Sequence, residues 1–344
     1  MGLVQIQFAV LRRKEFNRVM QFSLKALLVA FFLPHTLLPK DEIIEQAWDQ
    51  IVPENVDDLL EIQARLQSLL AKVQGAVVSI EASDGAGSGV IVSKDGLVLT
   101  AAHVIGSSDK KMTVRLPNGK RFPAISLGGS ELSDAGMLKI TKSGSWPYAK
   151  MAPRGSASLG DWCFGLGHPG GFDKERGIVV RVGRVIGNKD ETMQTDSRLL
   201  GGDSGGPLFD FDGQVIAIHS RISKKPDENF HVPIESFRAN WEFFQNSKLF
   251  TIAQMQKGGF LGVACKETGG SVIVVEAIEG TAAEKSGLQP NDIILAVDGE
   301  SIDNREELTI LLASKNPRDE IKLEYQREGR TQSLKIKLGK RPEE

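Results

Sequence analysis

Short runs of β-forming residues, separated by turns, occupy the middle of this 344-residue chain and constrain its fold more than any other feature. No helical segment alternates with these runs between residues 75 and 244, and Asp95-Gly96 between two of them is a strong hairpin signal. Many short strands without intervening helices predict antiparallel β-barrels rather than a parallel sheet. The predicted strands include Ala76–Ile80, Gly89–Val92, Leu97–Thr100, Met112–Leu116, Met137–Ile140, Ile178–Val182 and Val215–Ile218.

A second unit begins at Gly258, where strands mix with two helical stretches, Thr281–Ser286 and Arg305–Ser314. We expect a linker at residues 245–257 and an α+β domain at residues 258–340. Because domains mostly have about 100 to 150 residues, this chain length suits two folded units with short extensions.

The N-terminus has the features of a signal sequence. Five basic residues precede an apolar run from Ala26 to Leu38, namely Arg12, Arg13, Lys14, Arg18 and Lys25. That run is shorter than the roughly 20 residues that cross a bilayer as a helix. We predict a signal sequence or an uncleaved signal anchor at residues 1–40, and therefore a secreted or periplasmic protein that is either free or membrane-tethered. A buried amphipathic helix is the alternative, and Met20 is an alternative start.

Residues 41–74 carry apolar residues at helical spacing, and Pro53 interrupts the pattern. This spacing predicts two helices ahead of the first barrel, which together form a helical N-terminal extension.

The charge balance argues against a nucleic-acid partner. The chain has 42 basic and 44 acidic residues, a net charge of -2, and no basic block after residue 40. Its two cysteines, Cys163 and Cys265, fall in different predicted domains, which excludes a disulfide framework.

The segment Gly201–Leu208, with the sequence GGDSGGPL, is the strongest chemical signal. A serine that attacks a carbonyl needs backbone N–H groups directed at the developing oxyanion, and flanking glycines permit the tight turn that provides them. We predict Ser204 as the nucleophile and the N–H groups of Gly202 and Ser204 as the oxyanion hole.

A serine hydroxyl needs a base, and the base needs a carboxylate that orients it. His103 follows a predicted strand directly and is the best of the five histidines for this role. Asp134, at the entry to an apolar strand between His103 and Ser204, is the predicted carboxylate; Asp109, in a polar loop, is the weaker candidate.

The chain order His, Asp, Ser resembles that of the trypsin-like superfamily. The segments Gly87–Val92 and Gln194–Asp196 make it similar to the HtrA branch, and so do Gly165–Gly171 and Phe230–Pro233, with His168 and His231 as substitutions. The resemblance implies a chymotrypsin-like all-β double barrel at residues 75–244.

The second unit resembles a PDZ domain of the HtrA type, through Gly259–Val263, Gly280–Leu288 and Gln289–Gly299. The resemblance implies a carboxylate-binding loop made of Gly259, Phe260, Leu261 and Gly262. An extended peptide C-terminus would add as a strand beside this loop, with the helix from Arg305 as the groove wall. A purely structural PDZ domain is the alternative.

These features predict a serine endopeptidase that hydrolyses peptide bonds of unfolded or damaged envelope proteins through an acyl-enzyme, with no metal or organic cofactor. A binding protein or holdase with little proteolysis is the alternative from another class, and a regulatory sensor with one dedicated substrate fits the same residues. The resemblance implies a homo-oligomer, a trimer built by N-terminal elements. Residues 41–74 could supply these elements, and the alternative is that their helices only cover the barrel.

Asp203 departs from the HtrA pattern, which usually has Asn at this position. A carboxylate buried behind the nucleophile needs a partner, and we expect Arg198 or another arginine to provide it.

The S1 pocket, which holds the side chain before the cleaved bond, is the second departure. Its candidate residues are Arg198, Leu199, Ile218, His219 and Ser220. HtrA resemblance implies a small aliphatic P1 residue. His219, however, stands where glutamyl endopeptidases of the superfamily have a glutamate-reading histidine, and Arg198 could add a second positive charge. We therefore hypothesise an acidic P1 preference; the alternative is an apolar pocket with His219 in a wall hydrogen bond.

Overall fold

The computed structural model describes residues 46–342 except 83–84, 190–191, 224 and 226–227. The predicted signal sequence at residues 1–40 and the first residues of the predicted helical extension lie outside this range. The described residues belong to one compact unit. None of the helices in the described part of the chain is long and apolar enough to cross a membrane.

One of the two helices expected in the N-terminal extension is confirmed. Helix α1, Val56–Val73, begins at a capping box in which Asn55 accepts from the N–H of Asp58. Its buried side chains, Ile62, Leu69 and Val73, belong to the core of the barrels. Residues 46–55 form turns instead of the other helix, and Ile51, counted in its apolar pattern, is 74% exposed.

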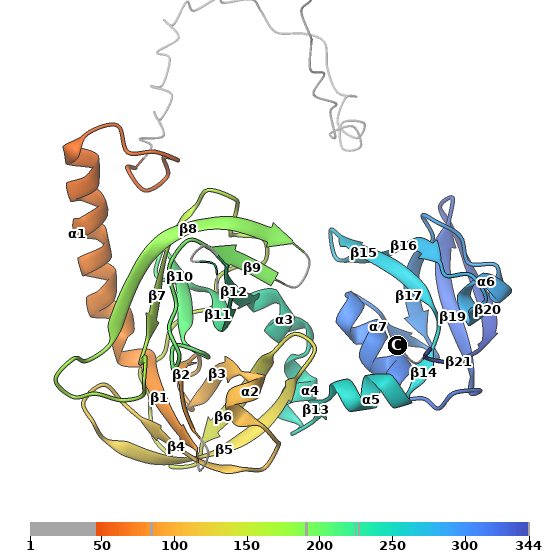
Figure 1. The fold of residues 1–344 in the computed structure, drawn as a ribbon, viewed down its shortest axis with the longest axis horizontal. Helices are drawn as coiled ribbons and strands as arrows, with labels where there is room; N and C mark the ends of the chain where they lie inside the picture. Colours follow the sequence, from red (N-terminus) through yellow and green to blue (C-terminus); the bar gives the residue numbers. More distant parts are fainter. Residues whose placement is uncertain (1–45, 83–84, 190–191, 224, 226–227, 343–344) are drawn as a thin grey trace, which may run out of the picture. The chain divides into compact units, whose positions relative to one another are not determined.

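The first barrel closes through six antiparallel strands (Figure 1). The strand order is β5-β4-β1-β2-β3-β6, and β6 pairs back with β5. A short strand β13, Leu249–Phe250, adds in parallel to β5. The bounds are β1 Val77–Ala82, β2 Gly85–Ile91, β3 Leu97–Ala101, β4 Lys111–Arg115, β5 Arg121–Ser130 and β6 Ala135–Ile140.

The second barrel also closes through six strands, in the order β10-β11-β12-β9-β8-β7. Phe164 of β7 and Phe209 of β10 stack with ring centroids 5.2 Å apart and belong to a core that this barrel shares with α1 and the first barrel. Helices α3, Ile234–Ala239, and α4, Trp241–Gln245, follow it. The strands are β7 Trp162–Gly167, β8 Val179–Lys189, β9 Thr192–Thr195, β10 Pro207–Asp210, β11 Val215–Ile222 and β12 Asn229–Pro233.

The C-terminal unit has its own buried core and an antiparallel sheet in which β15 is an edge strand. The segment expected to be a linker, residues 245–257, contains β13 and helix α5, Ile252–Lys257, so it is ordered structure. The remaining elements are β14 Gly259–Phe260, β15 Val263–Thr268, β16 Ser271–Ala277, α6 Ala282–Ser286, β17 Ile293–Val297, β18 Glu300–Ser301, α7 Arg305–Ala313, β19 Glu320–Arg327, β20 Arg330–Lys337 and β21 Gly339–Lys340.

This architecture confirms the predicted fold class, a chymotrypsin-like double barrel followed by an α+β domain and preceded by a helix. The two predicted helices of the C-terminal unit are α6 and α7.

Candidate functional site

The predicted base and carboxylate are brought together by the pairing of β3 with β6. Ala101 lies opposite Ala135 in that pairing, so the residues just beyond the strand ends meet. His103 stands in the short helix α2, Ala102–Ile105, and its Nδ1 lies 2.9 Å from both carboxylate oxygens of Asp134. The backbone of Asp134 has a φ of 62°, and Asp adopts this left-handed conformation more readily than most residues.

Further hydrogen bonds orient the Asp134 carboxylate. The His103 N–H donates to Oδ1 at 3.0 Å, and the Ser220 hydroxyl donates to Oδ2 at 2.5 Å. Burial favours the neutral carboxyl group, but the bonds from His103 and Ser220 outweigh it and lower the pKa of Asp134. The hydrogen bond to Asp134 in turn raises the pKa of His103 above 6.5, against the opposing effect of burial.

Asp109, the weaker candidate for the carboxylate, is an exposed residue. Its N–H donates to Ser126, and the carboxylate contacts of His103 are those with Asp134. The geometry therefore favours Asp134 over Asp109.

The loop between β9 and β10 carries Ser204 in a glycine-rich turn. Gly202 has a φ of 96°, and a Cβ there would lie 2.5 Å from the Gly170 nitrogen and 2.8 Å from the His168 oxygen. Both the conformation and the close approach require glycine. Within the described part of the chain, the N–H groups of Gly202 and Ser204 donate no hydrogen bond. Two adjacent unused donors are what an oxyanion hole requires.

The Ser204 hydroxyl donates to the Ser220 carbonyl at 3.2 Å. Among the described residues it forms no hydrogen bond with His103. Catalytic hydrogen bonds are often long or misaligned before substrate binds, so this arrangement agrees with a resting triad. Ser220, expected as an S1 candidate, supports Asp134 through its hydroxyl and Ser204 through its carbonyl.

Arg181 of β8 is the partner of the buried Asp203. Its guanidinium donates to Asp203 Oδ2 from Nε at 3.0 Å and from Nη2 at 2.6 Å. The Asp203 side chain is 2% exposed, whereas Arg198, the partner we had named, is exposed. The expectation of an arginine partner is confirmed, but the residue is Arg181. Its position in the apolar run Val179–Val182 was the signal in the sequence.

Of the remaining S1 candidates, three are buried. Leu199 is 3% exposed, and its N–H donates to the Asn229 side chain at 2.9 Å. Ile218 is fully buried, and His219 is 1% exposed. The His219 imidazole packs so closely on β7 that a Cβ at Gly165 would lie 2.7 Å from it.

His219 and His231 form a buried pair, with their Nδ1 atoms 3.0 Å apart. His231 Nε2 lies 2.8 Å from Thr195 Oγ1. One Nδ1 must donate and the other accept, so the accepting ring must be neutral. Burial agrees with this requirement, because it lowers the pKa of His219 well below 6.5 and the pKa of His231 to about 3.

The predicted carboxylate loop of the C-terminal unit lies at one end of a groove between β15 and α7. Among the described residues the N–H groups of Leu261 and Gly262 donate no hydrogen bond, whereas the Gly259 N–H is used by Lys315. Leu308 and Thr309 of α7 line the other wall.

The sequence analysis did not predict that arginine side chains line this groove. Arg341 places its guanidinium 4.6 Å from the Phe260 ring centroid, and both Arg341 and Arg305 line the groove. In the described part of the chain no cluster of three His, Cys, Asp or Glu residues could hold a metal ion.

Comparisons with known families identify both domains. Residues 87–218 match the trypsin-like peptidase domain, and residues 259–338 match the PDZ domain. The protein named "Probable periplasmic serine endoprotease DegP-like" of Pseudomonas fulva (strain 12-X) is 31% identical over 271 residues, which are 74% of this chain and 56% of the relative. A Haemophilus influenzae protein, "Probable periplasmic serine protease do/HhoA-like", is 31% identical over 273 residues, 74% of this chain and 58% of the relative. The chain thus spans just over half the length of these relatives.

Solved structures show the same fold. The HtrA-type protease AlgW with a tripeptide aligns with a TM-score of 0.54 and 24% identity, covering 81% of this chain and 98% of AlgW. The serine endoprotease from Yersinia pestis aligns with a TM-score of 0.52 and 22% identity, covering 80% and 98% of the two chains. The chain thus belongs to the trypsin-like peptidases that carry a PDZ domain after the peptidase domain, and it has the fold of HtrA-type proteases.

Proposed function

We propose that the protein is a serine endopeptidase whose triad is His103, Asp134 and Ser204. The observation that carries the proposal is the His103–Asp134 contact beside two unused N–H groups at Gly202 and Ser204. The protein names of the DegP-like relatives support it.

Each residue has a definite role in this chemistry. Asp134 accepts the Nδ1 proton of His103 and so leaves Nε2 free to take the Ser204 proton as the hydroxyl attacks the peptide carbonyl. The N–H groups of Gly202 and Ser204 stabilise the oxyanion, and His103 then returns the proton to the leaving amine. Water resolves the acyl-enzyme by the same steps.

The test is active-site labelling combined with digestion of casein. We expect a fluorophosphonate to label Ser204 and to stop hydrolysis, and Ser204→Ala to lose both label and activity by more than about 10⁴-fold. Ser223→Ala, at an exposed serine that follows β11, is the matched control and keeps both. Casein that is bound but not cleaved, with no label, would favour the holdase alternative.

The substrate class follows from the likenesses. We propose unfolded or damaged proteins of the periplasm, because both relatives are named as periplasmic proteins. We also propose, from the resemblance alone, that the protein forms a trimer through its N-terminal elements and that it retains a signal anchor.

For the S1 pocket we favour a small aliphatic P1 residue over an acidic one. A glutamate reader must donate to a carboxylate, but His219 is buried, neutral and bonded to His231. Arg198 is exposed and makes no ion pair within the described structure. Mass-spectrometric profiling of a digest should find cuts after Val, Ala or Leu; cuts after Glu that vanish in His219→Asn would reverse this assignment.

For the PDZ domain we propose binding of peptide C-termini along the edge strand β15. The free N–H groups of Leu261 and Gly262 suit a terminal carboxylate, and the arginines at the groove add positive charge. Thr309→Glu should weaken binding of a C-terminal peptide about tenfold, since it places a negative charge in the groove. Thr331→Glu, on the exposed surface of β20, is the control.

A further inference from the structure

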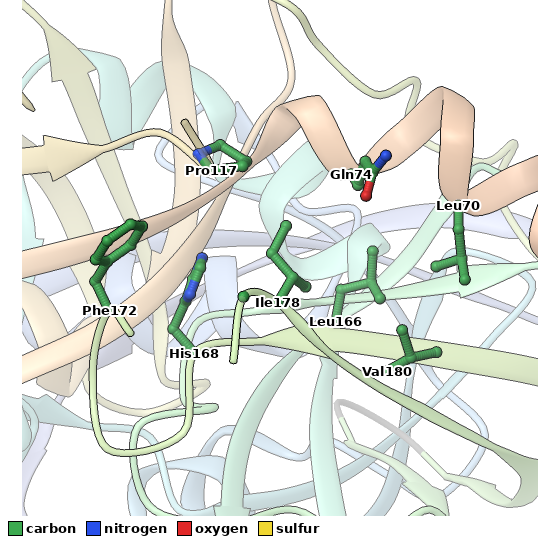
Figure 2. A pocket seen from close by; sticks show the side chains of 9 residues that line it. Leu70, Gln74, Pro117, Leu166, His168, Phe172, Ile178 and Val180 are labelled. Carbon is green, nitrogen blue, oxygen red and sulfur yellow. The ribbon is translucent and has the colours of Figure 1, made fainter. Parts of the chain in front are cut away.

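A pocket outside the predicted catalytic site lies between helix α1 and strand β8 of the second barrel (Figure 2). Its volume is about 250 Å³. An apolar cavity of ~150 Å³ is enough to hold benzene, so this pocket has room for a body of six to eight carbons. Its lining combines apolar and polar residues. Gln74 and His168 are polar, and the apolar part is formed by Leu70, Pro117, Leu166, Phe172, Ile178 and Val180.

One polar side chain in this lining has unmet hydrogen-bonding capacity. His168 is fully buried, and neither ring nitrogen has a hydrogen-bond partner in the described structure. Figure 2 shows its imidazole between Phe172 and Ile178. A buried polar group without a partner costs free energy, so a ligand that bonds to this ring would be favoured.

The surroundings of the pocket are positively charged. Burial and the nearby Arg176 lower the pKa of His168 to about 4. The Phe172 ring also lines an adjoining surface hollow, together with Arg115, Lys120 and Lys174.

Nearby acids offset part of this charge, and Glu175 lies next to Lys174 in the chain. Glu81 pairs with Arg115 at 3.1 Å, and Asp173 accepts N–H groups of its own loop. Lys120 and Lys174 make no ion pair within the described structure. A pocket with an apolar part, an unsatisfied imidazole and unpaired cations nearby is complementary to a molecule with a hydrocarbon body and an anionic head.

We propose that this pocket binds an aliphatic monocarboxylate of about six to eight carbons, with the hydrocarbon against Leu70, Leu166 and Val180 and the carboxylate near His168. The site does not depend on the proposed peptidase activity. It lies behind the turn that supports the oxyanion loop, because the Gly170 N–H donates to the Gly201 carbonyl at 2.8 Å and the His168 N–H donates to Ser88 Oγ at 2.8 Å.

The test uses sodium octanoate as the probe and isothermal titration calorimetry on the full chain. We expect saturable binding with a Kd of about 0.1–1 mM. Val180→Asp should weaken it at least about tenfold, because the new carboxylate repels the ligand and hydrates the pocket wall. Val182→Asp is the matched control: Val182 is two residues along the same face of β8, is 40% exposed against 38% for Val180, and is not part of the lining.

Two further measurements examine the ends of the ligand separately. 1-Octanol should bind at least about tenfold more weakly than octanoate if the charge is recognised. The NMR titration of His168 should shift to higher pH when octanoate is bound, since an adjacent anion favours the imidazolium.

A peptide that ends in leucine offers the same chemistry from another source. If octanoate binds, Ala-Ala-Leu does not, and Val180→Asp weakens the binding, the site is assigned to a free acid. If Ala-Ala-Leu binds, octanoate does not, and Val180→Asp weakens the binding, the site is assigned to a chain terminus. Equal binding by the Val180→Asp and Val182→Asp variants would place the ligand elsewhere, such as in the PDZ groove, and would overturn the proposal. Equal affinity for octanol and octanoate, or no saturable binding of either acid, would overturn it as well.

Discussion

Two histidines beside the Ser204 loop, one from each barrel, have opposite environments. His103 has a half-exposed side chain, 52% accessible, and faces the carboxylate of Asp134, which raises its pKa. His219 is buried, faces the neutral ring of His231 and has a lowered pKa. The difference shows that the partner and the burial of an imidazole set the direction of its pKa shift, and a raised pKa suits the proposed role of His103 as a base.

The largest expected effect comes from replacing Asp134, the carboxylate partner of His103. Asp134→Asn should lower turnover by roughly 10⁴-fold, because an amide favours the wrong tautomer of His103 while the geometry is kept. The measurement is kcat on a peptide substrate, with folding checked by circular dichroism. Asp109→Asn is the matched control, since Asp109 also has a positive φ, 58°, and Asn tolerates it. A fully active Asp134→Asn with an inactive Asp109→Asn would refute the triad assignment.

The second prediction concerns the ion pair between Arg181 and Asp203, next to the proposed nucleophile Ser204. Arg181→Met leaves the Asp203 carboxylate buried without its cation, which should cost about 3–5 kcal/mol of unfolding free energy in urea titrations. Arg198→Met removes an exposed arginine from the same barrel and should change stability by less than about 0.5 kcal/mol. Equal losses in both variants would contradict the assignment of Arg181 as the specific partner of Asp203.

The smallest expected effect is on the pH dependence of the unfolding free energy, to which the buried His231 and the half-exposed His103 contribute differently. The pKa of His231 is about 3 in the folded protein, and its ordinary value of 6.5 applies to the unfolded chain. Between pH 3 and pH 6.5 the unfolded chain therefore binds more protons than the folded protein. Stability contributed by the neutral ring is therefore present above pH 6.5 and is lost as the pH falls, by on the order of 3 kcal/mol near pH 4. Urea titrations from pH 7 to pH 4 should show this loss, and His231→Gln should make the slope shallower.

His103→Gln gives the opposite sign and serves as the control for that experiment. The folded pKa of His103 is raised, so its contribution is complete below pH 6.5 and disappears as the pH rises through the folded pKa. Replacing it should leave the loss of stability between pH 6.5 and pH 4 unchanged, and should remove the fall in stability that it causes as the pH rises above 6.5. The same slope in both variants would mean that the two environments do not differ as described.

Much of the fold was predictable because its signals are local. Strand runs, the Asp95-Gly96 hairpin and the helical spacing of residues 56–73 act over a few residues. The expected helix ahead of Pro53 was not found in residues 46–55, where Ala47 is buried and Trp48 stacks on Phe211 with ring centroids 6.5 Å apart. That packing is a tertiary interaction, which helical periodicity does not report.

By itself the sequence determined the double barrel, the PDZ unit and the three triad candidates, since each has a motif that is continuous along the chain. Only the tertiary structure decided which residues complete them. Arg181 reaches Asp203 across 22 positions, and Ser220 reaches Asp134 across 86. The sequence left open whether His219 is a charged residue that recognises glutamate or a neutral residue of the pocket wall, and its burial against His231 favours the neutral residue. Such partners meet through strand pairing and barrel closure, and their burial sets the cost of charge, so neither can be read from spacing along the chain.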